Sequence, residues 1–325
     1  MNSRIVMSGM RPTGALHLGY WEGALKNWLD LQEKFLCHFS IVDWHALTTE
    51  YQHPEKIGAN IRDVLLDWLS VGIDPDKSVL YVQSAVKEIA ELSLLLGMLT
   101  PLGWLERVPT FKEQQQQLKD RDLNTVGFLG YPLLMTVDIV IMRGEVVPVG
   151  EDQVYHVELA REIVRRFNAF YSPYFPEPQE FLTPIPKLPG LDGRKMSKSY
   201  DNAIYLSDSA ETVAKKVNPM VTDVRRQRRS DPGVPEDCPA FAFHKAFSAP
   251  SEIGEVSIEC RRAGIGCLDC KRIVIRNINA FLDPFRSRRA GFEKGRIVDI
   301  LESGNAKARR RAAQTLEAVR SLMKV

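Results

Sequence analysis

Two short segments far apart in the chain carry side chains suited to chemistry on phosphate groups. The first is Lys195-Met196-Ser197-Lys198-Ser199, which places two ammonium groups three residues apart on a loop opened by Gly190 and Gly193. Two such cations can follow negative charge as it builds on a reacting phosphate and on the group that leaves it. A single Lys-x-x-Lys is usually a solvated surface feature, so the complete five-residue string is what indicates a catalytic loop.

The second segment lies near the N-terminus, where His17 and Gly19 begin a helix after a turn that runs from Gly9 to Gly14. A helix N-terminus favours phosphate, because its backbone N–H groups are unpaired and its dipole is positive there. An imidazole in the first turn can reach a phosphate oxygen, and Gly19 leaves room for an adenine or a ribose. Alone, the segment is equally compatible with a helix start that binds nothing. Paired with the lysine loop, it predicts an ATP site.

At these residues the chain resembles the class I aminoacyl-tRNA synthetases, whose two signatures are written HIGH and KMSKS. The second signature is complete here. The first reads His17-Leu18-Gly19-Tyr20, so tyrosine stands where the signature has its final histidine. Tyr20 can pack against a nucleotide ring and donate a hydrogen bond, but it cannot carry a proton near neutral pH.

The elements that must position these residues alternate between strand and helix. Strand patterns at residues 4–8, 37–43, 79–83 and 146–149 alternate with helical patterns that begin after His17 and Pro54. This order predicts an α/β fold with a Rossmann-like, doubly wound parallel sheet, which binds ligands at the carboxyl ends of its strands. The turn after the first strand and the segment Gly150–Gln153 after the fourth are therefore expected to face the ligand.

A proline-rich stretch from Pro173 to Pro189 separates this pattern from mainly helical patterns. We predict a Rossmann-like catalytic domain over residues 1–195 and a helical domain over residues 196–305. A basic amphipathic helix from Ala306 to Met323 then marks a terminal segment, residues 306–325, which could pack back on the catalytic domain. The resemblance makes the helical domain the one that binds the tRNA anticodon.

Within the class, the resemblance runs nearly end to end to the bacterial tryptophanyl-tRNA synthetases. Residues 8–14, 43–47, 107–112, 131–138 and 147–153 carry it. In that family the aspartate that matches Asp138 accepts the indole N–H of tryptophan. A buried carboxylate would discriminate against phenylalanine, which leaves the carboxylate unpaired at a cost of ~1–3 kcal/mol or more.

The resemblance also assigns the remaining site residues. Those expected to bind tryptophan are Met7, Gly9, His45, Tyr131, Met135, Asp138, Val147, Val149 and Gln153. Those expected to bind ATP are Arg11, Pro12, Thr13, Gly19, Tyr20, Lys112, Gly150, Glu151, Asp152, Lys195, Met196, Ser197, Lys198 and Ser199. The expected catalytic residues are His17, Lys195 and Lys198. Without the resemblance, the methionines and valines would be interpreted as core residues, whereas a carboxylate within the apolar helical pattern around Asp138 needs a functional reason.

Four cysteines form a second group that could do chemistry. They are Cys238, Cys260, Cys267 and Cys270, separated by 21, 6 and 2 residues. In a cytoplasmic protein such a group binds metal more often than it forms disulfides, and four thiolates suit either zinc or a [4Fe-4S] cluster. A subset of bacterial tryptophanyl-tRNA synthetases carries a [4Fe-4S] cluster in the anticodon-binding domain. The chain is similar to this subset, although the first gap is one residue longer there.

The charge distribution points to a polyanionic partner for the second half of the chain. Residues 1–186 carry 16 Lys and Arg against 24 Asp and Glu, whereas residues 187–325 carry 27 against 17. Basic residues flank the cysteines: Arg225, Arg226, Arg228, Arg229, Arg261, Arg262, Lys271 and Arg272. Phosphate contacts from such residues supply most sequence-independent affinity for nucleic acid. The sequence offers no signal peptide and no apolar stretch that could span a bilayer, so a cytoplasmic protein without a membrane partner is expected.

Together these observations predict a homodimeric, Mg²⁺-dependent enzyme that attaches L-tryptophan to tRNA(Trp) through a tryptophanyl-adenylate formed from ATP. Two alternatives stay open. One is a tyrosyl-tRNA synthetase, which shares the fold and usually pairs a tyrosine hydroxyl with the aspartate in its pocket. The other is an inactive iron–sulfur or RNA-binding paralogue, against which the intact Lys195 and Lys198 argue.

Overall fold

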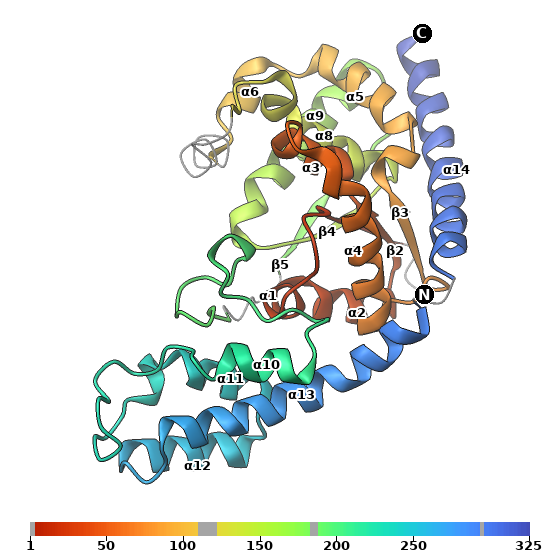
Figure 1. The fold of residues 1–325 in the computed structure, drawn as a ribbon. Helices are drawn as coiled ribbons and strands as arrows, with labels where there is room; N and C mark the ends of the chain where they lie inside the picture. The colour runs from red at the N-terminus through yellow and green to blue at the C-terminus, as the bar shows by residue number, and fades with distance from the viewer. Residues whose placement is uncertain (1–3, 110–121, 183–187, 293–295) are drawn as a thin grey trace. The chain divides into compact units, whose positions relative to one another are not determined.

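The computed structural model describes residues 4–109, 122–182, 188–292 and 296–325 (Figure 1). Internal contacts divide the chain into two compact units. The first unit is drawn from Met1–Gly14, Asn27–Pro184 and Phe292–Val325, and the second from Ala15–Lys26 and Ile185–Gly291. Both units are discontinuous in sequence, and the segment around His17 belongs to the second.

The first unit contains a parallel sheet of five strands in the order β3-β2-β1-β4-β5. The strands are β1 (Ile5–Met10), β2 (Leu36–Ile41), β3 (Ser78–Val82), β4 (Val146–Val149) and β5 (Gln179–Leu182). The order reverses between β1 and β4, and open α/β sheets bind their ligands beyond the carboxyl ends of the strands at such a point. The predicted doubly wound α/β sheet is confirmed.

Helices connect the strands and continue beyond the sheet. In chain order they are α1 (Leu18–Tyr20), the π-helical turn η1 (Trp21–Leu25), α2 (Lys26–Gln32), α3 (Asp43–Glu50), α4 (Ile57–Val71), α5 (Glu88–Leu99), α6 (Leu102–Glu106), α8 (Val126–Ile141), α9 (Val154–Phe170), α10 (Ala210–Val217), α11 (Pro239–Phe247), α12 (Pro250–Arg261), α13 (Cys267–Phe292) and α14 (Ile297–Met323). Short 3₁₀ turns lie at η2 (Pro54–Lys56), η3 (Gln83–Ala85), η4 (Glu151–Gln153), η5 (Lys198–Tyr200) and η6 (Pro235–Asp237). No described helix is both long enough and apolar enough to cross a membrane.

The core of the first unit lies where α5, α8, α9 and α14 pack together with strand side chains. Its apolar residues include Met7 on β1 and Val147 and Val149 on β4, all of them buried. A second aromatic cluster forms around Trp28, whose ring stacks on Phe39 at 4.2 Å and meets Trp68 edge-on at 5.2 Å. The strands are therefore anchored by burial of large apolar side chains, which is the dominant favourable term in folding.

The helix α14 covers the free edge of the sheet along β3 (Figure 1, blue beside orange). The Asn305 side-chain oxygen accepts the Val82 backbone N–H at 2.9 Å, which satisfies a donor that an edge strand would otherwise leave open. The Arg309 guanidinium donates to the Ala85 carbonyl at 2.6 Å, and Arg311 donates to the Met142 carbonyl at 2.6 Å. The end of the chain thus protects the sheet.

Helices build the second unit, in agreement with the predicted helical C-terminal region. The N-terminal segment is part of this unit, because Trp21 packs against Phe281 at 5.2 Å and Phe285 at 5.3 Å. The Lys271 ammonium, which is only 7% exposed, donates to the Asn218 carbonyl at 2.8 Å and so links α13 to the end of α10. This lysine serves the packing of the helices.

Two elements differ from the sequence-based prediction. Strand β5 was not predicted, because it lies in the proline-rich stretch, although its four residues include no proline. The last helix begins at Ile297 and not at Ala306. Gly304 lies inside it, where the helix approaches the β3 backbone so closely that a side chain would not fit. The division into functional domains at residues 195 and 305 stays a prediction.

Gly304 offers a test of the contact between α14 and β3. A β-carbon at this position would overlap the Leu80 carbonyl oxygen, so Gly304→Ala must displace the helix from the strand. We expect it to lower the free energy of unfolding by roughly 1–3 kcal/mol, as overpacking does. The matched control is Gly58→Ala on α4, where no atom lies within 4 Å and a stabilisation of roughly 0.5–1 kcal/mol is expected. Denaturant unfolding measures the free energy of unfolding of both variants. Equal values for the two would contradict the close contact between α14 and β3.

Candidate functional site

The two predicted signature segments lie against each other within the second unit. Residues 16–18 pair with residues 204–206: the Leu18 N–H donates to the Ile204 carbonyl at 2.9 Å, and the Leu206 N–H donates to the Leu16 carbonyl at 2.8 Å. This pairing brings the chain that follows the lysine loop alongside the start of the first helix. Segments that are more than 170 residues apart in sequence therefore form one local structure.

The lysine loop itself is held by the buried side chain of Asn202, which is 3% exposed. Its side-chain oxygen accepts the Ser197 N–H at 2.8 Å, and its amide nitrogen donates to the Lys195 carbonyl at 3.1 Å and to Asp192 Oδ1 at 2.7 Å. These bonds fix the backbone on both sides of Met196, which is buried, while Lys195 is exposed to solvent. The buried Asn202 amide thus supports the backbone of the loop, and the solvent-exposed Lys195 ammonium can reach a ligand.

His17 is a buried imidazole beside this loop. Burial, together with the positive charges of Lys198 and Lys195, lowers its pKa from 6.5 to about 4, so the ring is neutral near pH 7. Its Nδ1 is buried and has no hydrogen-bond partner within the described part of the chain. Gly19 permits this arrangement, because a β-carbon there would lie 2.9 Å from His17 Nδ1. A neutral ring nitrogen of this kind can bind a ligand oxygen.

Tyr20 occupies the position of the second signature histidine and completes this group. Its ring lies 4.5 Å from the His17 ring, and the Lys198 ammonium lies 5.6 Å from the centre of the Tyr20 ring. The tyrosine therefore presents an aromatic face to a lysine of the other segment. This is a cation–π arrangement, which holds an ammonium group without neutralising it.

In the first unit, the buried carboxylate of Asp138 on α8 is the centre of a polar cluster. Asp138 is 3% exposed, and the His45 Nε2 donates to its Oδ2 at 3.1 Å. The Gln83 side-chain amide donates to Oδ1 at 2.9 Å and to Oδ2 at 2.8 Å. The sequence-based reasoning found Asp138 and His45 but missed Gln83. The available signal was a polar residue directly after a buried strand, at the edge of the sheet where ligands bind.

Aromatic rings line the surroundings of this cluster. The Tyr131 ring lies 6.4 Å from the His45 ring and 5.4 Å from the His156 ring, edge-on in both cases. Burial lowers the pKa of His156 to about 4, with a further contribution from His45. The Tyr81 hydroxyl, which is fully buried, donates to Met7 Sδ at 3.7 Å. Three residues predicted to bind tryptophan are thus brought together with two residues that were not predicted.

The structure places the remaining predicted residues as follows. Met135 packs against the core that contains Met7, Val147 and Val149. Gly9 lies on β1, where a β-carbon would meet Val42. Arg11, Pro12 and Thr13 form the turn after β1. Gly150 lies directly after β4, and Glu151, Asp152 and Gln153 form η4. Within η4 the Gln153 side-chain amide donates to the Asp152 carboxylate at 3.1 Å. Lys112 lies outside the described residues.

The four cysteines line one small cavity in the second unit, of about 20 Å³, together with Arg226 and Ile265. The Arg226 guanidinium approaches Cys260 Sγ at 3.8 Å, and His244 Nε2 lies 3.2 Å from Cys270 Sγ. Among the described residues, no three His, Cys, Asp or Glu side chains are positioned to hold a single metal ion. The thiols nevertheless converge from four points of the chain on the same space, with a cation beside them. Thr222 and the Asp223 carboxylate also line this cavity.

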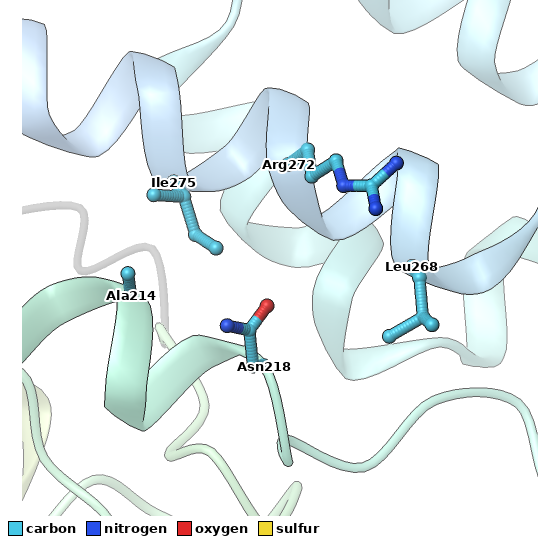
Figure 2. Close-up of a pocket in the computed structure, with 5 residues that line it drawn as sticks. All are labelled: Ala214, Asn218, Leu268, Arg272 and Ile275. Carbon is cyan, nitrogen blue, oxygen red and sulfur yellow. The ribbon is translucent and has the colours of Figure 1, made fainter.

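A wider groove lies nearby in the same unit, between α10 and α13. It has a volume of about 480 Å³ and is lined by Ala214, Asn218, Leu268, Arg272 and Ile275. Figure 2 shows Ile275 and Leu268 extending from α13 toward α10, with the Arg272 guanidinium on the same helix. An exposed arginine at the rim of an apolar groove is a combination that suits a planar, polar ligand group.

Comparison with known proteins accounts for this arrangement. The family model described as "tRNA synthetases class I (W and Y)", the tryptophan and tyrosine enzymes, matches residues 2–283. The chain belongs to this family. Among relatives of this class I synthetase, the tryptophan–tRNA ligase of Thermotoga maritima is 49% identical over 98% of each chain. That of Aquifex aeolicus is 43% identical over 98% of this chain and 99% of its own.

Among solved structures, the class I synthetase is similar to tryptophanyl-tRNA synthetase from Campylobacter jejuni, which was crystallised with ADP and tryptophan. The two are 34% identical with a TM-score of 0.91, over 99% of this chain and all of the other. Tyrosyl-tRNA synthetase from Archaeoglobus fulgidus also matches, with a TM-score of 0.67 over 89% of this chain and 91% of its own, but at 22% identity it shows a shared fold only.

The arrangement around Tyr20 predicts that its ring, and not its hydroxyl, supports Lys198. We expect Tyr20→Phe to keep the rate of pyrophosphate exchange into ATP within about twofold. Tyr20→Ala should lower that rate about 5- to 10-fold, because a cation–π contact contributes about 1 kcal/mol at a partly exposed site. An equal loss in both variants would show that the hydroxyl is required.

Proposed function

We propose that this protein activates L-tryptophan with ATP and transfers it to tRNA(Trp). The observation that carries the proposal is the buried Asp138 carboxylate, which two fixed donors hold as a hydrogen-bond acceptor. Indole offers one N–H donor and no acceptor, so it matches this carboxylate in a way that a phenyl ring cannot. Sequence identities of 43% and 49% to two tryptophan–tRNA ligases, each over 98% of this chain, support the same substrate.

In the first step, an oxygen of the tryptophan carboxylate attacks the α-phosphorus of ATP. The bond to the bridging oxygen of the β-phosphate breaks, and pyrophosphate leaves with tryptophanyl-adenylate as the product. Lys195, Lys198 and the neutral His17 stabilise the negative charge that builds on the phosphates. Mg²⁺, when bound to the nucleotide, supplies further positive charge. In the second step, a hydroxyl of the terminal ribose of the tRNA, in this class usually the 2′ hydroxyl, takes the acyl group and AMP leaves.

The remaining predicted residues complete this proposal. The nucleotide side would comprise Arg11, Pro12, Thr13, Gly19, Tyr20, Lys112, Gly150, Glu151, Asp152, Met196, Ser197 and Ser199. The tryptophan side would comprise Met7, Gly9, His45, Tyr131, Met135, Val147, Val149 and Gln153 beside Asp138. The apolar members fit an indole ring, since Met sulfur and β-branched side chains pack well on an aromatic face. Tyrosine is the less suitable substrate, because Tyr81 directs its hydroxyl to Met7 and does not bond Asp138.

The second unit would meet the tRNA through its exposed arginines. Arg225, Arg228, Arg229 and Arg272 are exposed. Arg225 pairs with Asp223 and Asp237, Arg229 and Arg272 pair with Asp269, and Arg226 faces the cysteine cavity. Phosphate contacts need solvated cations, so the exposed arginines are the better candidates. Helical residues 196–305 would then form the anticodon-binding domain.

We further propose that the four cysteines hold a [4Fe-4S] cluster. Two observations support it: the thiols share one cavity, and the Arg226 cation that faces them would offset the negative charge of a thiolate-bound cluster. A single zinc ion bound by the four thiolates is the alternative, and metal analysis distinguishes the two. The cluster would be structural, holding α12 and α13 in the arrangement that presents the arginines.

The protein is expected to act in the cytoplasm, where its substrates are found, and as a homodimer. Large apolar side chains exposed on α5 and α6 support an interface in the first unit: Leu94, Met98 and Leu102 are 61%, 73% and 58% exposed. Contiguous exposed apolar surface commonly marks a protein–protein contact.

Amino-acid-dependent exchange of pyrophosphate into ATP tests the function. Tryptophan should support exchange in the wild-type protein. Lys198→Ala should lower kcat by about 100-fold or more with little change in the KM for tryptophan, because it removes charge stabilisation of the transition state. The control is Lys215→Ala, an exposed lysine on α10 that pairs with Glu211, which should leave exchange unchanged. Exchange that depends on tyrosine would favour the alternative enzyme, and none at all would refute the proposal.

Metal analysis tests the cluster. Protein purified without oxygen should contain about four iron atoms per chain and absorb at about 400 nm. Cys267→Ala should lose both signals, whereas Cys37→Ala on β2, far from the group in sequence, should keep them. One zinc per chain, or no metal, would contradict the cluster. The structural role fails if the Cys267→Ala protein lacks the cluster yet charges tRNA normally.

A further inference from the structure

Gln83 is a buried side chain of the first unit whose polar atoms bond the Asp138 carboxylate and the backbone at the start of α3. It lies directly after β3 and is fully buried. Its Oε1 accepts the backbone N–H groups of Trp44 at 3.1 Å and of His45 at 3.3 Å, at the start of α3. Its Nε2 donates to both oxygens of Asp138. One amide therefore joins the end of a strand, the start of a helix and the carboxylate at the centre of the site.

The orientation of this amide is fixed by its partners. A backbone N–H can only donate, so the oxygen of the amide must face α3, and the nitrogen must face Asp138. The backbone of this turn is held as well, because Asp43 Oδ1 accepts the Ser84 N–H at 3.0 Å. The two segments thus hold each other through reciprocal bonds, and Gln83 presents N–H groups, never an acceptor, to Asp138.

This has a consequence for what Asp138 can bind. The two oxygens of a carboxylate offer about four acceptor positions. Gln83 and His45 together occupy Oδ2 twice and Oδ1 once. An acceptor position on Oδ1 is left for a further donor. A ring with an N–H satisfies it, whereas a ring without one leaves a buried carboxylate incompletely paired.

We propose that Gln83 is a positioning residue that fixes Asp138 as an acceptor and thereby sets the preference for an aromatic substrate with a ring N–H. The inference rests on the proposed activation of tryptophan. It assigns part of the substrate specificity to a residue that acts only through Asp138 and the start of α3. Its removal should weaken discrimination between ring types more than it weakens chemistry.

The test compares tryptophan with the analogue in which sulfur replaces the indole N–H, by the ratio of their kcat/KM values in pyrophosphate exchange. Gln83→Glu keeps the acceptor that faces α3 and replaces the donor to Asp138 by a second carboxylate. Gln83→Met removes both. In each variant we expect the ratio to fall at least about tenfold, mainly through a higher KM for tryptophan, with kcat for the analogue nearly unchanged.

A second buried glutamine provides the matched control. Gln32 on α2 bonds the backbone of Gly72 and Asp74 and not Asp138, so Gln32→Met should lower stability without changing the ratio. If tryptophan and the analogue lose activity in parallel in both Gln83 variants, the role is merely structural and the inference is wrong. The proposed function is judged separately, by whether the wild-type protein depends on tryptophan at all.

Discussion

The buried negative charge of Asp138 is the constraint on which the first unit depends. A carboxylate that is 3% exposed is tolerated only if donors compensate for its lost hydration. Gln83 and His45 provide them, and these side chains come from the end of β3 and the start of α3, while Asp138 lies on α8. The hydrogen bonds to this one carboxylate therefore fix β3, α3 and α8 relative to one another. In the proposed function, a substrate ring would meet an acceptor whose geometry exists before binding, which is how a preorganised site gains specificity.

A buried amide also supports the loop that carries Lys195 and Lys198. Asn202 is a buried amide in the second unit, and its bonds to Ser197, Lys195 and Asp192 shape the backbone of that loop. In both units a buried side-chain amide fixes the local structure: Gln83 bonds the Asp138 carboxylate, and Asn202 bonds the backbone of the lysine loop. The edge of the sheet is closed in a similar way, since Asn305 on α14 accepts the open N–H of β3. Polar side chains at buried positions thus define the functional geometry, while apolar packing supplies the stability.

Much of the fold could be predicted from sequence, because β1 to β4 are continuous apolar runs and the helices between them have clear periodicity. Strand β5 could not, since it is only four residues long and the prolines around it are typical of loops. Asp138 was recognisable as a charge in an apolar helix. Gln83 was recognisable only as a polar residue after a buried strand. Its role was not, because its partners lie 39 and 55 residues away in sequence and only the fold brings them together. The cysteine spacing predicted that the thiols gather, but spacing does not determine whether they bind a metal or which one.

A crystal structure of the full chain with tryptophan bound tests the central claim most directly. The account predicts that the indole nitrogen lies about 2.7–3.2 Å from an Asp138 carboxylate oxygen, while the bonds from Gln83 and His45 to that carboxylate persist. An indole nitrogen that donates to another group, or a Gln83 amide turned away from Asp138, would contradict it.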